Sequence, residues 1–166
     1  MTAIVDNFLT PDTIEKILLY TRSTTNLRTN LTGWHNEVVG TSGVILLWDL
    51  QGQLFQDIKQ ETMKQLPQYQ YLFNREWSIC SHVGTRLSYI PWHNDEKHAL
   101  SVTVYLNSSW EKEWAGYLLY EEQDHIRALL PKFNRAIVFT PPLMHTVLPT
   151  NIMAPLRESL QIFIDG

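Results

Sequence analysis

The 166-residue sequence has a single cysteine, Cys80, so no disulfide can form within the chain. We therefore expect a reducing compartment and predict a cytoplasmic location. Long apolar runs are also missing, since none approaches the roughly 20 residues that a membrane-spanning helix needs. The first residues, MTAIVDNFLTPD, have neither a basic segment nor a long apolar one, so the sequence predicts no signal peptide and no membrane partner.

Basic residues are few and scattered: 13 Lys and Arg stand against 17 Asp and Glu, for a formal net charge of −4. A surface that neutralises phosphates is therefore not expected, and the sequence predicts no nucleic-acid partner. Hydrophobic residues make up 44% of the chain, which excludes wholesale disorder and allows a packed core. The length suits a single domain, predicted over residues 1–166.

The N-terminal part of the chain predicts helices. Thr10 has the character of an N-cap and Pro11 of a first helical residue, and apolar residues follow them at helical spacing. We predict one helix over residues 11–22, another over 53–66, and between them a loop and a strand within Arg28–Leu50.

From about residue 77 onward, apolar and polar residues alternate in short runs, as in strands whose successive side chains point to opposite faces. In the clearest runs, Ala99–Leu106 and Leu156–Ile164, one face is apolar. The other face carries Ser, Thr, Tyr, Gln, Phe and one Arg, with little of the Lys or Glu typical of a surface. Further strands are predicted over Ile79–Tyr89, Tyr117–Glu121, Ala136–Phe139 and His145–Leu148.

These faces allow two architectures. In a sandwich, the polar faces point to solvent and the apolar faces share a core. In a small barrel, the N-terminal helices cover the apolar exterior and the interior holds one polar ligand. We predict the barrel, a mainly β fold with a helical brace over about residues 1–70 and a barrel core over about residues 77–165.

A metal site is predicted from the sequence Trp92-His93-Asn94-Asp95. On an extended backbone His93 and Asp95 project from the same face, about 6–7 Å apart at their α carbons, where an imidazole and a carboxylate can close on one cation. A third ligand would complete the 2-His-1-carboxylate triad of non-heme Fe(II) oxygenases. His145 is the best candidate, because it follows a predicted strand and a Pro-Pro turn.

The alternative for these residues is a structural role. A His-x-Asp sequence occurs often by chance, and His145 taken alone also suits a turn. The four remaining histidines are expected to be structural or surface residues, with a ligand role for His98 as an open alternative: His35, His82, His98 and His125.

Arg157 lies on the polar face of the last predicted strand, twelve residues after His145. An Arg that faces a barrel interior needs an anionic partner, because an unpaired buried charge is very unfavourable. A ligand carboxylate would serve, bound by both arms of the guanidinium, and the hydroxyl of Tyr105 could join it. The alternative is an ion pair with Glu158 or Glu121 at a barrel rim.

The order of these residues resembles the signature of the iron(II)/2-oxoglutarate-dependent dioxygenases: His93-Asn94-Asp95, then His145, then Arg157. Within this family, the resemblance is to the prolyl-hydroxylase-like group. Three further stretches are similar to this group's Tyr-Leu-Asn strand and loop, its Gly-Gly-x-Leu strand start and its Pro-x-x-[Gly/Asn/Asp]-Arg-x-x-x-Phe run. They are Val104–Asn107 with Trp110, Ala115–Leu118 and Pro131–Phe139. The resemblance covers about residues 77–165.

The resemblance implies a double-stranded β-helix, or jelly roll, with helices packed on one side. Arg157 would then bind the distal carboxylate of 2-oxoglutarate with Tyr105 as its hydrogen-bonding partner, and Tyr89 would touch the cofactor or the substrate. The Fe(II) ligands implied by the resemblance are His93, Asp95 and His145.

The implied reaction couples oxidative decarboxylation of 2-oxoglutarate by O2, with ascorbate as a supporting reductant, to oxidation of an unactivated C–H bond. Halogenating members of the family have lost the carboxylate ligand, so Asp95 favours hydroxylation, or a related desaturation or cyclisation. The expected target is a prolyl or other aliphatic side chain in a peptide, a protein or a peptide-like metabolite.

Two alternatives remain open: a tailoring oxygenase for a free amino acid or small natural product, and a non-catalytic cupin-like module that binds 2-oxoglutarate. Nucleic-acid demethylation belongs to another branch of the family, and the acidic balance counts against it. Substrate selectivity is expected in Arg28–Trp48, around Trp92 and in the loop Glu111–Trp114. Four tryptophans are candidate pocket or lid residues: Trp34, Trp92, Trp110 and Trp114.

Overall fold

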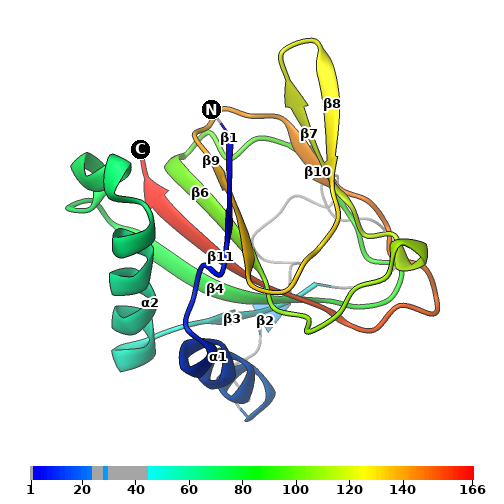
Figure 1. Cartoon of the computed structure of the whole chain (residues 1–166), viewed down its shortest axis with the longest axis horizontal. Helices are drawn as coiled ribbons and strands as arrows, with labels where there is room; N and C mark the ends of the chain where they lie inside the picture. The colour runs from blue at the N-terminus through cyan, green and yellow to red at the C-terminus, as the bar shows by residue number, and fades with distance from the viewer. Residues whose placement is uncertain (1, 24–27, 30–44) are drawn as a thin grey trace.

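The computed structural model describes residues 2–23, 28–29 and 45–166, which form two facing antiparallel sheets with α-helices on one side (Figure 1). The strands of the larger sheet are, in spatial order, β1 (Thr2–Asp6), β9 (Arg135–Phe139), β6 (His98–Tyr105), β11 (Arg157–Asp165), β4 (Trp77–Gly84), β3 (Ile45–Asp49) and β2 (Arg28–Thr29). Those of the smaller sheet are β5 (Ile90–His93), β10 (His145–Val147), β7 (Leu118–Glu122) and β8 (His125–Leu129). This arrangement confirms the predicted double-stranded β-helix.

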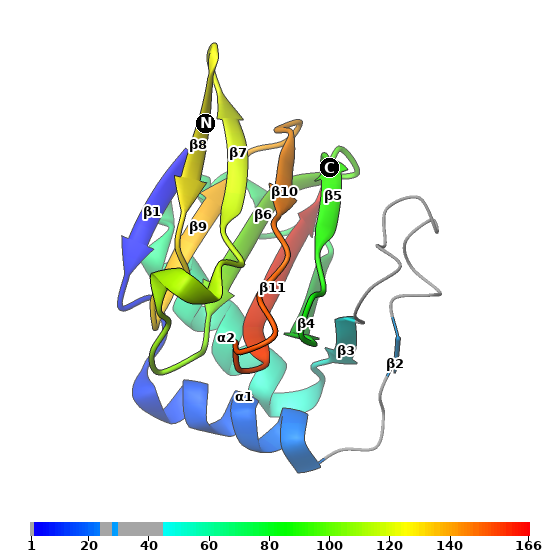
Figure 2. The same cartoon turned by 90° about the vertical axis from the view of Figure 1, so that its right-hand side faces the viewer.

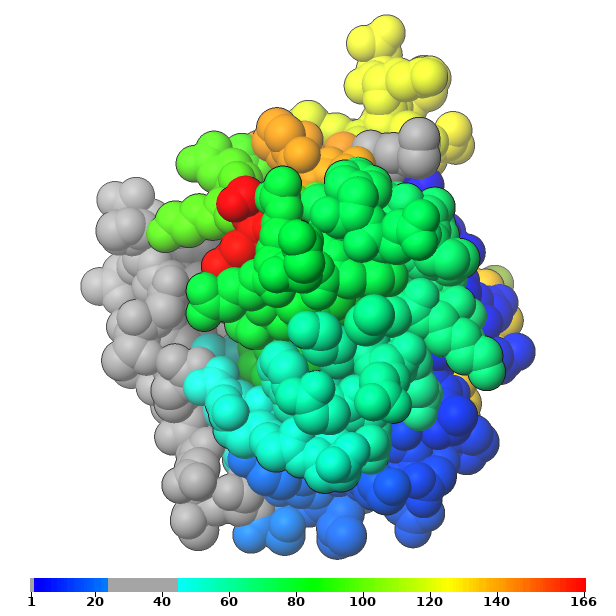
Figure 3. Space-filling model, turned by 90° about the vertical axis from the view of Figure 1, so that its left-hand side faces the viewer, coloured from blue at the N-terminus to red at the C-terminus, as the bar shows by residue number. Residues whose placement is uncertain are grey.

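Two α-helices, α1 (Pro11–Ser23) and α2 (Gly52–Gln65), lie on the outer face of the larger sheet (Figure 2). Seen from that side, α2 covers much of the molecule and α1 lies below it (Figure 3). Two short 3-10 helices, η2 (Pro67–Leu72) and η3 (Lys112–Trp114), complete the described elements. Both α-helices agree with the sequence prediction to within one residue at each end.

Thr10 is the N-cap of α1, as its sequence position predicted. Its hydroxyl accepts a hydrogen bond from the backbone N–H of Thr13, at 3.3 Å. The carboxylate of Glu61, in α2, accepts hydrogen bonds from the backbone N–H and the hydroxyl of Thr10, at 2.6 and 2.9 Å. The start of α1 is therefore bound to a side chain of α2.

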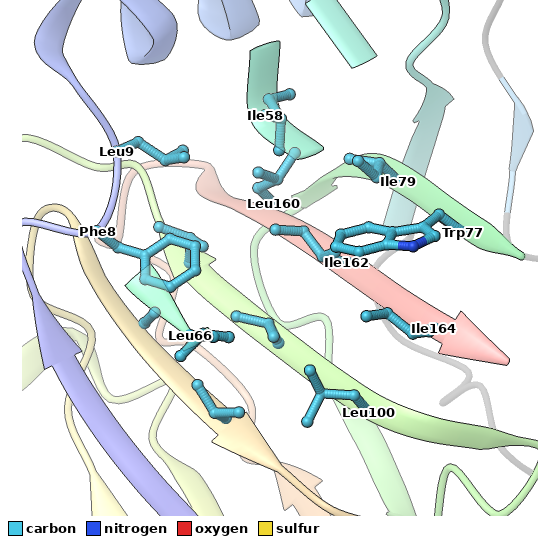
Figure 4. Packing of buried hydrophobic residues seen from close by; sticks show 14 of the residues in the cluster. Phe8, Leu9, Ile58, Leu66, Trp77, Ile79, Leu100, Leu160, Ile162 and Ile164 are labelled. Atoms are coloured by element: carbon cyan, nitrogen blue, oxygen red, sulfur yellow. The ribbon is translucent and has the colours of Figure 1, made fainter. Parts of the chain in front are cut away.

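The main hydrophobic core lies between the helices and the outer face of the larger sheet (Figure 4). The helices contribute Ile14, Ile17 and Ile58, which are at most 3% exposed. The sheet contributes the predicted apolar faces of β6 and β11: Leu100, Val102, Val104, Leu160, Ile162 and Ile164. These faces are covered by the N-terminal helices, as the barrel prediction requires and the sandwich alternative does not.

The strand β1 was not predicted from the sequence, and it pairs with β9 along its whole length. Asp6 in β1 accepts hydrogen bonds from Arg135, at 2.6 Å, and from Lys132, at 2.9 Å. The first residues thus contribute a strand to the barrel in addition to the helical brace. This strand escaped prediction because TAIVD is short and its pairing partner lies about 130 residues away.

Asn134 connects the start of the chain to the barrel. It has a φ of 54°, a left-handed conformation that Gly, Asn and Asp adopt most readily. Its side chain donates to the carbonyl of Leu9, at 2.7 Å, and accepts from the N–H of Leu9, at 2.9 Å. This conformation gives a physical reason for Gly, Asn or Asp at this position of the Pro-x-x-[Gly/Asn/Asp]-Arg run.

Two strand predictions need correction. The strand expected over 79–89 ends at Gly84, because a turn follows in which Leu87 has a φ of 65°. The edge strand β8 was missed, since its first four residues are exposed and carry no buried alternating face. Among the described residues, no helix is long and apolar enough to cross a membrane.

Candidate active site

A cavity of about 230 Å³ lies between the two sheets, and the polar faces of the strands form its floor. The residues that line it come from both sheets: Leu47, Cys80, His82, Ile90, His93, Asp95, His98, Thr103, Leu118, His145, Val147, Arg157, Gln161 and Phe163. The cavity therefore contains both the predicted metal ligands and the predicted anion-binding arginine.

His93, Asp95 and His145 offer ligand atoms that all lie within 4.8 Å of one another. The Nε2 atom of His93 is 3.8 Å from Oδ1 of Asp95, and Nε2 of His145 is 3.7 Å from Oδ2 of the same carboxylate. His93 ends β5 and His145 begins β10, and these two residues are paired in the sheet. Strand pairing thus brings together residues that are 52 positions apart.

Both histidines are held with Nε2 available to a metal. Nδ1 of His93 lies 2.8 Å from the carbonyl oxygen of Pro91, and Nδ1 of His145 lies 2.9 Å from that of Leu143. A carbonyl only accepts, so each Nδ1 carries the hydrogen and each Nε2 keeps its lone pair. Burial, together with the neighbouring His93, lowers the pKa of His145, which favours the neutral imidazole that a metal needs.

Asp95 is oriented by Ser101, which donates a hydrogen bond from its hydroxyl to Oδ2 at 2.6 Å. Ser101 lies on the inward face of β6, where it is only 2% exposed. A bond to a ligating carboxylate fixes the direction of its remaining lone pairs.

Arg157, at the start of β11, is only 7% exposed, and its Nε and Nη2 atoms have no hydrogen-bond partner among the described residues. Burial lowers the pKa of Arg157 and raises the pKa of Tyr105. The aromatic ring of Tyr105 lies 5.3 Å from the guanidinium carbon, and its hydroxyl is also unpaired among the residues described. Glu158 forms its ion pair with Arg22 instead, so it does not neutralise Arg157.

The backbone around Arg157 is fixed by Asn107 of the Tyr-Leu-Asn stretch. The amide of Asn107 donates to the carbonyl of Leu156 and accepts from the N–H of Glu158, each at 2.8 Å. Gly116, with a φ of +68°, packs closely against its neighbours, since a Cβ there would lie 2.9 Å from Cγ2 of Thr150 and 3.2 Å from Cζ2 of Trp110, while Cδ of Arg157 would be at an ordinary contact distance of 3.6 Å.

His82, which the sequence analysis placed among the structural or surface residues, is buried and lines the cavity. Burial, and to a lesser extent the charge of Arg157, lowers the pKa of His82 to about 3, so the imidazole is neutral. Cys80, two residues earlier on the same face of β4, has its sulfur 3.3 Å from Nε2 of His82. A signal in the sequence could have predicted an inward face of β4 with polar residues. Every second residue of this strand is small or polar: Ser78, Cys80, His82 and Gly84.

His98 also lines the cavity, although the sequence analysis placed it among structural or surface residues. Its ring stacks on Phe163, with the ring centroids 4.5 Å apart and the planes at 28°. Deeper in the cavity, Thr103 donates a hydrogen bond of 2.6 Å to Gln161. Gln161 and Phe163 belong to the predicted polar face of the last strand, which confirms that this face points inward.

Tyr89 is half-buried and borders a second, much smaller cavity of about 10 Å³, which His82 and Arg157 also line. Trp92 is 42% exposed beside His93, whereas Trp110 and Trp114 pack edge to face, with centroids 5.5 Å apart. None of these four aromatic side chains is among the described residues that line the main cavity. The predicted candidates Trp34 and His35, and residues 30–44 of the expected selectivity segment, lie outside the described residues.

This donor set fits iron and a keto acid. Two neutral imidazoles and one carboxylate are the facial ligands typical of non-heme Fe(II). Two guanidinium nitrogens of Arg157, unpaired within the described part of the chain, match a carboxylate, and a dicarboxylate would relieve the cost of the buried charge.

Comparison with protein families gives a match to the 2OG-Fe(II) oxygenase superfamily over residues 79–165. That range runs from within β4 to the end of β11, and it includes all three candidate metal ligands and Arg157. No curated protein sequence matches the chain significantly.

Solved structures with the same fold include three prolyl hydroxylases. A prolyl-4-hydroxylase of Pseudomonas putida is 18% identical, with a TM-score of 0.72 over 99% of this chain and 91% of that one. A prolyl hydroxylase of Trichoplax adhaerens is 15% identical, with a TM-score of 0.79 over 99% of this chain and 83% of that one. It was solved with a peptide fragment of the hypoxia inducible factor oxygen degradation domain. The collagen prolyl hydroxylase of Paramecium Bursaria Chlorella virus-1, solved with 2OG, is 14% identical, with a TM-score of 0.68 over 99% and 96%.

Proposed function

The chain belongs to the 2OG-Fe(II) oxygenase superfamily, and from this premise we propose that it hydroxylates a prolyl or other aliphatic side chain in a peptide, a protein or a peptide-like metabolite. It is an iron- and 2-oxoglutarate-dependent dioxygenase. One observation carries the proposal: a complete His-Asp-His cluster shares a cavity with a buried arginine whose Nε and Nη2 are unpaired among the described residues.

In this proposal His93, Asp95 and His145 hold Fe(II), and Arg157 binds the distal carboxylate of 2-oxoglutarate, assisted by Tyr105. When bound, the iron and the keto acid supply the oxidising power: one atom of O2 enters succinate, formed with CO2, and the other enters the hydroxylated product. Contact of Tyr89 with the cofactor or the substrate stays a prediction.

The side chains of the site have separable tasks. The charge of Asp95 offsets part of the metal charge, and Ser101 keeps this carboxylate oriented. Arg157 fixes the keto acid by charge-assisted hydrogen bonds, which are strong where water is excluded. Apolar walls, formed by Leu47, Ile90, Leu118 and Val147, limit the entry of water and suit an aliphatic target.

The size of the cavity supports a second candidate substrate class. About 230 Å³ has to accommodate the keto acid as well as the reacting group, which is small compared with typical ligand pockets. A free amino acid or a small natural product therefore remains a candidate beside a peptide. The fold similarity to prolyl hydroxylases, one of them solved with a bound peptide fragment, favours the peptide.

The proposed setting is a reducing, cytoplasmic one in which Fe(II) persists, and the proposed partners include neither nucleic acid nor membrane. The single cysteine supports the first proposal, and the formal net charge of −4 supports the absence of nucleic acid.

The function is tested by measuring 2-oxoglutarate consumption with Fe(II), ascorbate and O2 against a panel of peptides and metabolites. We expect succinate formation coupled to a product heavier by one oxygen atom, as read by mass spectrometry. His93→Ala should abolish both signals, while His125→Gln, on the exposed strand β8, should leave them unchanged. Iron binding without any 2-oxoglutarate turnover, alone or with the panel, would instead favour a non-catalytic binding module.

A further inference from the structure

His98 lies at the end of the cavity opposite to Arg157. It is the first residue of β6 and pairs with Asp165, the last residue of β11, whereas Arg157 is the first residue of that strand. Eight residues of extended chain span roughly 26 Å. The cavity thus has a buried cation at one end and a histidine beside a carboxylate at the other.

His98 is held by three contacts, two of which involve its ring. Its backbone N–H donates to the carbonyl of Asp95 at 2.9 Å, directly after the metal-binding turn. Its Nδ1 lies 3.0 Å from Oδ1 of Asp165, and the ring stacks on Phe163 with the centroids 4.5 Å apart. A side chain held by a backbone turn, a carboxylate and an aromatic ring is preorganised for contact with a ligand.

The contact with Asp165 determines which nitrogen of His98 can accept. An ionised carboxylate only accepts hydrogen bonds, so Nδ1 carries the hydrogen. In the neutral imidazole Nε2 then carries a lone pair, and it has no hydrogen-bond partner among the described residues. The Asp165 side chain is 48% exposed at this end of the cavity.

We propose that His98, held by Asp165 and Phe163, recognises a substrate nitrogen that carries a hydrogen. The inference rests on the proposed function and narrows its substrate class: the oxidised aliphatic group lies close to an ammonium or N–H group. Free amino acids, N-terminal residues and ordinary peptide amides have such a nitrogen. A prolyl residue within a peptide has none, so for such a substrate the donor has to be a neighbouring residue.

The first test reads the histidine tautomer and needs neither metal nor substrate. Nitrogen-15 NMR of the histidine-labelled protein at alkaline pH, where imidazole is neutral, should give the signature of Nδ1–H for His98. In Asp165→Ala the acceptor is gone, and the signal should shift toward the Nε2–H form. An Nε2–H signature in the unaltered protein would overturn the proposal, because His98 would then donate rather than accept.

The second test compares probes that differ only in the nitrogen. The protein is loaded with Zn(II) and 2-oxoglutarate to prevent turnover, and binding is measured for L-proline against cyclopentanecarboxylate and for L-leucine against 4-methylpentanoate. We expect the nitrogen-bearing member to bind about tenfold more tightly in at least one pair. His98→Phe keeps a stacking ring but no acceptor and should remove this preference, His98→Gln should keep part of it, and His125→Gln should not change it.

Any one of three results would overturn the inference. They are equal affinity within both pairs of probes, no binding of either nitrogen-bearing probe, and an unchanged preference for the nitrogen-bearing probe in His98→Phe. Failure of the proposed function is a separate outcome, since it would appear as no consumption of 2-oxoglutarate in the iron-loaded protein. The tautomer and the probe preference are measured without turnover and decide the role of His98 in either case.

Discussion

Ser101 donates a hydrogen bond of 2.6 Å to Oδ2 of Asp95, the carboxylate that lies between His93 and His145. This bond comes from the inward face of β6 and crosses to the turn after β5, so it connects the proposed metal site to the larger sheet. The proposed metal ligands are therefore oriented by both sheets of the barrel.

Removing this hydroxyl should weaken iron binding. In Ser101→Ala the carboxylate of Asp95 loses its fixed direction, and we expect a loss of about 10- to 100-fold in Fe(II) affinity, the range seen when such supporting bonds are lost. Titration with Fe(II) under anaerobic conditions measures the effect. Ser101→Thr keeps a hydroxyl and should retain most of the affinity. Equal Fe(II) affinity in all three proteins would show that Ser101 has only a packing role.

Replacing Arg157 should separate cofactor binding from folding. In Arg157→Met we expect the affinity for 2-oxoglutarate to fall by about 30-fold or more, since truncating one partner of a buried charge pair costs about 2 kcal/mol or more. Without ligand the variant should be at least as stable as the original, because a buried cation with Nε and Nη2 unpaired among the described residues has been removed.

Thermal unfolding with and without 2-oxoglutarate checks both parts of this prediction. The ligand should raise the Tm of the original protein but not that of Arg157→Met, and the exposed Arg127→Gln serves as the control. A large loss of stability in the ligand-free variant would indicate that Arg157 has a structural anion partner instead.

Asn107 should affect the cofactor site without touching it. Its amide bonds to the backbone on both sides of Arg157, at Leu156 and Glu158. Asn107→Ala loses both bonds, so we expect weaker 2-oxoglutarate binding, by about 5- to 30-fold, with unchanged Fe(II) affinity. Calorimetric titration of each ligand measures this, with the exposed Asn74→Ala as control. If the affinities for Fe(II) and for 2-oxoglutarate fell by the same factor, the effect of the substitution would not be local to Arg157.

The neutral, buried His82 should make stability depend on pH. Its pKa is about 3 in the folded protein and near 6.5 in the unfolded chain, so between these values only the unfolded chain binds the proton. Acidification below about pH 6.5 therefore destabilises the fold, by at most about 1.4 kcal/mol per pH unit from this residue.

Urea unfolding of the original protein and of His82→Gln at a series of pH values from 7 to 5 isolates this contribution. The free energy of unfolding should fall more steeply with acidification in the original protein than in the variant. The exposed His125→Gln should follow the original protein. Parallel curves for the original protein and His82→Gln would show that His82 already titrates normally in the folded state.

Local patterns in the sequence predicted a large part of this protein. Apolar residues at helical spacing located both α-helices, and the Thr-Pro start located the first residue of α1. The alternation of apolar and polar residues located the two faces of β6 and of β11. His93 and Asp95 could be proposed as a pair because two-residue spacing on extended backbone decides by itself that they share a face. The motif order then identified His145 and Arg157, although nothing local connects them to that pair.

Only the tertiary structure decided what meets across the barrel. Strand pairing of β5 with β10 places His145 beside His93, and pairing of β4 with β11 places His82 near Arg157. The acceptor role assigned to His98 likewise depends on Asp165, 67 residues away and paired with it in the sheet. These relationships follow from the register between strands, which is fixed by packing of the whole core. A short stretch of sequence therefore determines which residue types face inward, and the assembled sheets determine which of them meet.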